Sequence, residues 1–262
     1  MRRLAALALL PLVLVACRDH TVALAFRPDI GSTYRYEVRV HAVSTTTLEG
    51  QEPERTDEEV RLIAEHTVLN AGPDGVRVQV LVGEPGTAAQ VFLLEFNRSA
   101  QLESIESTEG VPADVVGALG LTEIFPGGAG GPPDRRLAPG DAWTVDRRIT
   151  LPGAQDPSRL RVSGHLAELG RAGDEDVARV DTSTEVPFRG TLATSTGVVV
   201  LEGRQHVEQR ATYDLDDGAV RSVRATTTGT FDVLVQPPSG TIAESVPGTL
   251  EVRVTSRTRR LS

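Results

Sequence analysis

Cys17 is the only cysteine in this chain of 262 residues, and it stands where an apolar run meets polar sequence. A single cysteine excludes an intramolecular disulfide, so its thiol is free for other chemistry. Residues 4–16 before it are apolar and include one proline, and they follow Arg2 and Arg3. This order is typical of an export signal. The run of about thirteen apolar residues is too short for a membrane-spanning helix, which needs roughly 20.

Residues Leu14, Val15, Ala16 and Cys17 resemble the lipobox of bacterial lipoproteins, in which Leu, a small or branched residue and a small residue precede Cys. The resemblance implies cleavage between Ala16 and Cys17, diacylglycerol on the Cys17 sulfur, and an acyl group such as palmitate on the new amino terminus. Each buried CH2 contributes about 0.8 kcal/mol, so two or three chains make a stable anchor. The alternative is an ordinary signal peptide in which Cys17 is incidental, or one cleaved a little further on. We expect a lipid-anchored protein on the extracytoplasmic side of a bacterial membrane.

The net charge of the chain and its lack of lysine exclude several classes of partner and of catalytic chemistry. The formal net charge is −9, and removal of residues 1–16 would make it more negative, because Arg2 and Arg3 would be lost. An acidic body repels phosphate backbones and anionic head groups, so we expect no nucleic-acid partner and a hold on the membrane through lipid on Cys17. The sequence contains no lysine. Schiff-base, Walker A and Ser-x-x-Lys chemistries, which each need a lysine amine, are therefore excluded.

The remaining residues that could do chemistry have simpler explanations. The five histidines lack the spacing of metal ligands: His20, His41, His66, His165 and His206. The acidic pairs and triplets are expected to be solvated or to form turns: residues 58–59, 174–176, and Asp214, Asp216 and Asp217. The glycines of residues 127–131 lack the Lys-Ser/Thr of a phosphate loop, and Trp143 is expected in the core. We predict no catalytic residue, no metal and no cofactor.

Alternating apolar and polar residues predict strands through most of the chain. Residues 33–41 alternate strictly, which is the period-two pattern of a half-buried strand. Residues 44–59 are polar and acidic and are expected to form a loop or a long hairpin tip. Residues 60–69 and 76–82 flank strong turn residues and predict a hairpin, and residues 89–96 and 102–105 add two further strands.

A change of pattern near the middle of the chain predicts a helix and a linker. Residues 112–121 have helical spacing, and residues 125–133 are rich in Gly and Pro. Strands are predicted again afterwards, and the last of them is followed by arginines that we expect to form a solvated tail. These later ranges are 143–151, 160–169, 177–186, 197–201, 207–215, 220–235 and 250–254, with the tail at Arg257, Arg259 and Arg260.

Residues 137–143 (LAPGDAW) resemble the Gly-Asp-x-Trp strand start of uncharacterised β-rich bacterial lipoproteins. Such a family implies a periplasmic or cell-surface lipoprotein and names no activity. A separate analogy is to LolA-like and LppX-like half-barrels, in which a curved antiparallel sheet closes over helices to hold acyl chains. This sequence departs from that pattern because it offers only one helix.

We therefore predict a mainly β protein with antiparallel curved sheets, and either two related β halves or one long curved sheet with a short helix near the middle. The expected divisions are a signal peptide (1–16), a lipidated tether (17–30), a first β half (31–110), a helix and Gly/Pro linker (111–135) and a second β half (136–262). The expected function is a non-enzymatic binding or scaffold module of the cell envelope, with an apolar ligand or an envelope protein as partner. The alternatives are a lipid or glycolipid carrier with a half-barrel cavity and a hydrolase of unrecognised type.

Overall fold

The described part of the chain forms one antiparallel β-sheet. A computed structural model describes residues 21–97, 102–109, 132–133, 135–149, 158–194, 197–237 and 244–261. Eleven strands lie in these ranges. They are β1 (Thr33–Leu48), β2 (Glu54–Ala71), β3 (Val76–Gly83), β4 (Gln90–Phe96), β5 (Leu102–Glu109), β6 (Ala142–Ile149), β7 (Ser158–Ala172), β8 (Glu175–Thr194), β9 (Gly197–Asp214), β10 (Val220–Gln236) and β11 (Val246–Leu261). The predicted mainly β, antiparallel class is confirmed.

The first and last strands lie side by side in the middle of the sheet. The strand order is β5-β4-β3-β2-β1-β11-β10-β9-β8-β7-β6. The chain thus begins at the centre, meanders to the β5 edge, continues at the opposite β6 edge and meanders back until β11 pairs with β1. No ladder of hydrogen bonds joins β5 to β6, so the sheet is open. Of the two arrangements that the sequence allows, the structure has the one long sheet.

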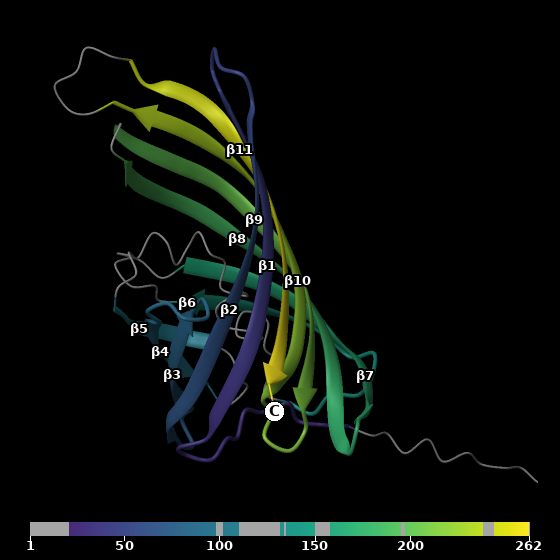
Figure 1. The fold of residues 1–262 in the computed structure, drawn as a ribbon. Coiled ribbons are helices and arrows are strands. Elements are labelled where there is room, and N and C mark those ends of the chain that lie inside the picture. The colour runs from purple at the N-terminus through teal and green to yellow at the C-terminus, as the bar shows by residue number, and fades with distance from the viewer. Residues whose placement is uncertain are drawn as a thin grey trace, which may run out of the picture.

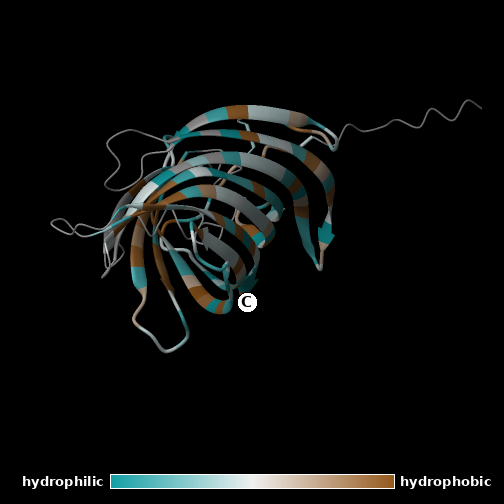
Figure 2. Cartoon of the chain, turned by 90° about the horizontal axis from the view of Figure 1, so that it is seen from above, coloured by the Kyte–Doolittle hydropathy of each residue, from teal (hydrophilic) through white to brown (hydrophobic). Residues whose placement is uncertain are grey.

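The sheet is strongly curved and has an inner and an outer face (Figure 1). Because side chains alternate along a strand, Tyr36 and Val38 lie on the inner face and are buried, whereas Arg39 and His41 lie on the outer face and are exposed. Seen from above, the strands form an arch (Figure 2). The core gathers on the inner face toward the lower end in Figure 1, where β1 begins and β11 ends.

Residues 21–30, assigned from the sequence to a tether, lie across this lower end. Val22 pairs with Leu137 through two backbone hydrogen bonds, and the Leu24 side chain is part of the core. The Phe26 ring lies 6.2 Å from the Tyr34 ring and 6.0 Å from the Phe96 ring. These contacts join a segment from the start of the chain to strands far along it.

Several strands, among them β1, β2, β9 and β11, run further than the sequence predicted. Residues 44–48 and 54–59 belong to β1 and β2 and pair in register, so only residues 49–53 form the expected loop. The predicted break at residues 202–206 is wrong, because β9 is continuous there and pairs on both sides. The solvated arginine tail is also wrong. Residues 255–261 belong to β11, between β1 and β10.

Other predictions fall outside the described residues. The helix at residues 112–121 and most of the linker at residues 111–135 are among them. The relationship between the two β halves stays a prediction. Trp143 is confirmed as a core residue, with 8% of its surface exposed.

Candidate functional site

The predicted lipidation and cleavage residues, Ala16 and Cys17, lie outside the described residues. Thr21 lies at the lower end of the sheet, where its hydroxyl accepts a hydrogen bond from Arg136 next to the Val22–Leu137 bridge. Four residues of fully extended chain span at most about 14 Å. A group attached to Cys17 is therefore tied within that distance of Thr21.

A patch of polar side chains interrupts the apolar inner face. Six buried Ser, Thr and Gln residues on β8 to β11 make up this inner polar patch: Thr182, Thr184, Gln209, Thr227, Ser256 and Thr258. The strand registers bring them together. Thr182 is opposite Gln209, Ala225 is opposite both Gln209 and Ser256, and the others occupy adjoining inner positions. None of the six side chains carries a charge.

Several buried polar atoms on this face have no hydrogen-bond partner among the residues that the structure describes. They are Nε2 of Gln209, Oγ1 of Thr227, Oγ1 of Thr258 and, nearby on β6, Nε1 of Trp143. A buried polar group without a partner costs about 1–3 kcal/mol, so it usually marks a bound water or ligand. The inner polar patch can donate hydrogen bonds to an uncharged carbonyl or hydroxyl group whose apolar remainder lies on the neighbouring face.

Trp143 contacts the patch through a glycine on the next strand. Trp143 is directly opposite Gly164, and a Cβ atom added at Gly164 would lie 2.6 Å from the indole ring. Only glycine allows the ring to lie so close to β7. Gly164 in turn is opposite Thr182, a member of the patch. The sequence analysis placed Trp143 in the core but contained no signal for its unpaired Nε1.

A second polar cluster closes the lower end of the sheet. Tyr34 donates a hydrogen bond to Asp217 at 2.9 Å, and Arg260 donates one to Asp214 at 3.0 Å. Glu175 bridges Arg221 and Arg260. Burial, together with the hydrogen bond to Asp217, raises the pKa of Tyr34. Burial alone would lower the pKa of Arg260, but the hydrogen bond to Asp214 and the nearby carboxylates raise it.

The Asp-rich turn of this cluster has the role expected from the sequence. Asp214 Oδ1 accepts a hydrogen bond from the Asp216 backbone, and Asp217 Oδ1 accepts one from the Ala219 backbone. Such bonds are typical of Asp in tight turns. The carboxylates of the lower end are thus held by arginines and backbone amides.

His66 is a histidine of the inner face with a buried ring. Its ring lies 4.8 Å from the Tyr36 ring, and its buried Nε2 has no hydrogen-bond partner. Burial lowers the pKa of His66 to about 4. His41 contacts Asp57 at 2.8 Å, and His165 lies 3.6 Å from Asp181. Within the described ranges, no three His, Cys, Asp or Glu residues gather in a way that could hold a metal.

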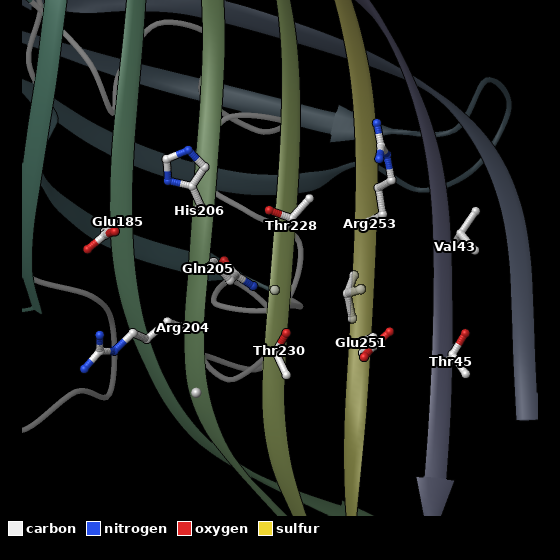
Figure 3. A pocket seen from close by; sticks show the side chains of 13 residues that line it. Val43, Thr45, Glu185, Arg204, Gln205, His206, Thr228, Thr230, Glu251 and Arg253 are labelled. Atoms are coloured by element: carbon white, nitrogen blue, oxygen red, sulfur yellow. The ribbon is translucent and has the colours of Figure 1, made fainter. Parts of the chain in front are cut away.

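The outer face carries an open hollow of about 760 Å3 (Figure 3). Side chains of mixed charge stand around it on β8 to β11 and β1, among them Glu185, Arg204, His206, Glu251 and Arg253. Gly203 and Gly229 form part of its lining, and the Phe231 ring covers both from the inner side, because a Cβ atom at either would lie within 2.8 Å of it. This surface can take a polar ligand.

Comparison with known proteins yields likenesses among solved structures only. No family model and no curated protein matches the sequence. Among solved structures, the chain is similar to OmpTdeltaL8, a loop L8 deletion mutant of OmpT, an outer membrane protein of Vibrio cholerae. The identity is 10%, the match covers 89% of this chain and 100% of that chain, and the TM-score is 0.24. In the part of the chain that the structure describes, no helix is long and apolar enough to span a bilayer.

Proposed function

We propose that this chain is a lipoprotein of the bacterial cell envelope, held on the extracytoplasmic side of a membrane by lipid on Cys17, and that it is a non-enzymatic binding module. The sequence Leu14-Val15-Ala16-Cys17 at the end of an export signal carries the proposal. Thr21, at the lower end of the sheet, lies within about 14 Å of Cys17, so the protein would stand on the membrane by its lower end.

Replacement of the anchoring thiol tests the tether. The Cys17→Ser variant, expressed in a bacterium that processes lipoproteins, should remain uncleaved or be released from the membrane fraction, because serine gives no thioether to diacylglycerol. The measurements are incorporation of radiolabelled palmitate and the mass of the mature amino terminus. Arg18→Ala is the matched control and should keep both the label and the membrane fraction. Labelled, membrane-bound Cys17→Ser protein would overturn the tether.

A second candidate function is favoured by the inner polar patch. An open sheet with an apolar inner face and unpaired, uncharged donors suits an amphiphile, such as a lipid or glycolipid, whose ester or hydroxyl group meets Gln209 and Thr227. In this form the module is a carrier. The uncharged patch favours neutral head or linker groups, because it offers no counter-ion to a charged one.

Native mass spectrometry of the protein purified from its own membrane tests the carrier. A lipid mass additional to the covalent anchor is expected, with occupancy reduced in Gln209→Leu and unchanged in the outer-face control Thr226→Val. Protein that carries no additional mass in any preparation, or equal occupancy in both variants, would exclude this role for the patch. The tether would stand in either case.

A further inference from the structure

Five arginines form one row across the outer face of the sheet. The strand registers place each directly opposite the next, in the order Arg61, Arg39, Arg257, Arg224 and Arg210. The five strands are neighbours, and a strand spacing of about 4.8 Å makes the row about 19 Å long. Like charges directly opposite one another destabilise a sheet. A row of this kind is therefore unfavourable unless anions lie along it.

Carboxylates of the chain neutralise the two ends of this arginine row. Glu37 lies 2.6 Å from Nε of Arg39 and 2.8 Å from Nη2 of Arg61. Asp181 accepts two hydrogen bonds from Arg210, at 2.6 and 2.8 Å, in the planar pairing that a guanidinium offers a carboxylate. Hydrogen bonds from these arginines lower the pKa of Glu37 and of Asp181.

The middle of the row has no such partner. Arg224 and Arg257 are exposed, and no described carboxylate lies within ion-pair distance of either. Arg259, two residues along β11 on the same face, is directly opposite Glu37 and so belongs to the neutralised part of the row. Hydroxyl groups flank these guanidinium groups, since Ser222 is opposite Arg259 and Thr226 is opposite Thr255.

The row enters a hollow of the outer face at its β9 and β10 end. This hollow has a volume of about 760 Å3, and Arg210, Arg224 and Thr226 are among its lining residues. Two carboxylates also line it: Glu208, directly opposite Thr226, and Asp181 on β8. An extended chain that follows the row would lie across β11 and β10 and end in this hollow.

We propose that the middle of the arginine row binds a linear polyuronate, an acidic polysaccharide with one carboxylate on each sugar. The two ends of the row already show the group that these arginines hold, a carboxylate. A polyuronate carries carboxylates along its whole length, so a chain lying along the row can bring them to both Arg257 and Arg224, which stand on neighbouring strands. Sugar hydroxyls then meet the flanking Ser and Thr side chains.

The same surface does not suit an anionic membrane. Membrane-surface binding combines cations with apolar side chains that enter the bilayer. The large apolar residues most exposed in the described ranges are Ile30 and Leu69, and neither lies in the row. The carboxylate pairing at both ends and the hydroxyl groups beside the middle favour a sugar acid over a phosphate polymer.

Isothermal titration calorimetry of the full chain with a galacturonate hexamer tests the proposal. We expect saturable binding that weakens with added salt, because exposed ion pairs are screened. The double variant Arg224→Gln/Arg257→Gln should bind at least about tenfold more weakly, since it loses two charge-assisted contacts. The fully methyl-esterified hexamer, which keeps the hydroxyls and loses the charges, should bind at least as weakly.

A matched double variant controls for net charge. Arg148 and Arg159 are also exposed and directly opposite each other, on β6 and β7. Arg148→Gln/Arg159→Gln removes two charges elsewhere on the same sheet and should bind as the wild type does. Both double variants should unfold at the wild-type temperature or above, because a like-charge contact is removed. Absent binding, equal loss in the two double variants, equal binding of the methyl ester, or tighter binding to anionic vesicles or polyphosphate would overturn the proposal.

Discussion

The inner and outer faces of β9, β10 and β11 both carry groups without partners, but of different kinds. On the inner face the unpaired groups are neutral and buried, as in Gln209 and Thr227. On the outer face they are cationic and exposed, as in Arg224 and Arg257. The backbone between them is the same ladder of hydrogen bonds.

This difference shows how one sheet can meet two chemistries. Burial removes water, so an inner site must rely on neutral hydrogen bonds and apolar contact, whereas unpaired charge is tolerated only where water reaches it. Adjacent residues of one strand lie on opposite faces. The effect of a substitution on the inner face can therefore be compared with that of a substitution at the next residue, on the outer face.

The largest effect is expected at Trp143. Trp143→Ala removes a buried indole that lies on Gly164 and should lower the free energy of unfolding by about 3–5 kcal/mol. The neighbouring outer-face variant Thr144→Ala should change it by less than about 0.5 kcal/mol. Urea unfolding followed by circular dichroism gives both values. Similar losses in the two variants would contradict the assignment of faces.

His66 should make the inner face sensitive to acid. The unfolded chain protonates this histidine near pH 6.5 and the folded chain near pH 4, so between these values the unfolded state binds the extra proton. The contribution of His66 to stability is therefore present above pH 6.5 and lost as the pH falls toward 4, by up to about 3 kcal/mol.

The variant His66→Phe isolates this effect. It keeps an aromatic ring beside Tyr36 and has no proton to bind. The difference in unfolding free energy between wild type and variant should move in favour of the variant as the pH is lowered from 7 to 4. A difference that stays constant over this range would mean that His66 is not buried in its neutral form.

The smallest effect separates Thr227 from Thr226. Thr227→Val replaces an unpaired buried hydroxyl by a methyl group of similar size and should raise the unfolding free energy of delipidated protein by up to about 1 kcal/mol. Thr226→Val on the outer face should leave it within about 0.5 kcal/mol. Destabilisation by Thr227→Val would show that the hydroxyl has a partner in the folded protein.

Alternation was enough to predict most strands, and its failures have physical causes. Residues 202–206 contain charged residues, a glycine and Gln205, which interrupt the alternating pattern. They nevertheless belong to β9, whose inner side is covered there by Phe231 of the next strand. Residues 255–261 were predicted as a tail because arginines are usually solvated. Ser256 and Thr258 alternate with them and pack inward, which the period of two could have revealed.

The site could be predicted only in part, because it depends on register. Sequence placed Trp143 in the core, but nothing local shows that Gln209 and Thr182 are neighbours or that Arg39 stands opposite Arg257. Those pairs are far apart in the chain and meet through the order of the strands. The lipidation of Cys17 rests on a local motif and needs no such information.

The pairing of β1 with β11 sets the order in which the molecule can be completed. If the chain crosses a membrane from its amino end, β1 emerges first. Its second neighbour, β11, emerges only after nearly the whole sequence has crossed. Until then β1 presents an open edge, of the kind that invites pairing with other chains. Pairing of β1 with β11 closes a loop of nearly the whole chain, which makes folding slow. A chaperone that binds unfolded chains would therefore be needed longest at that edge.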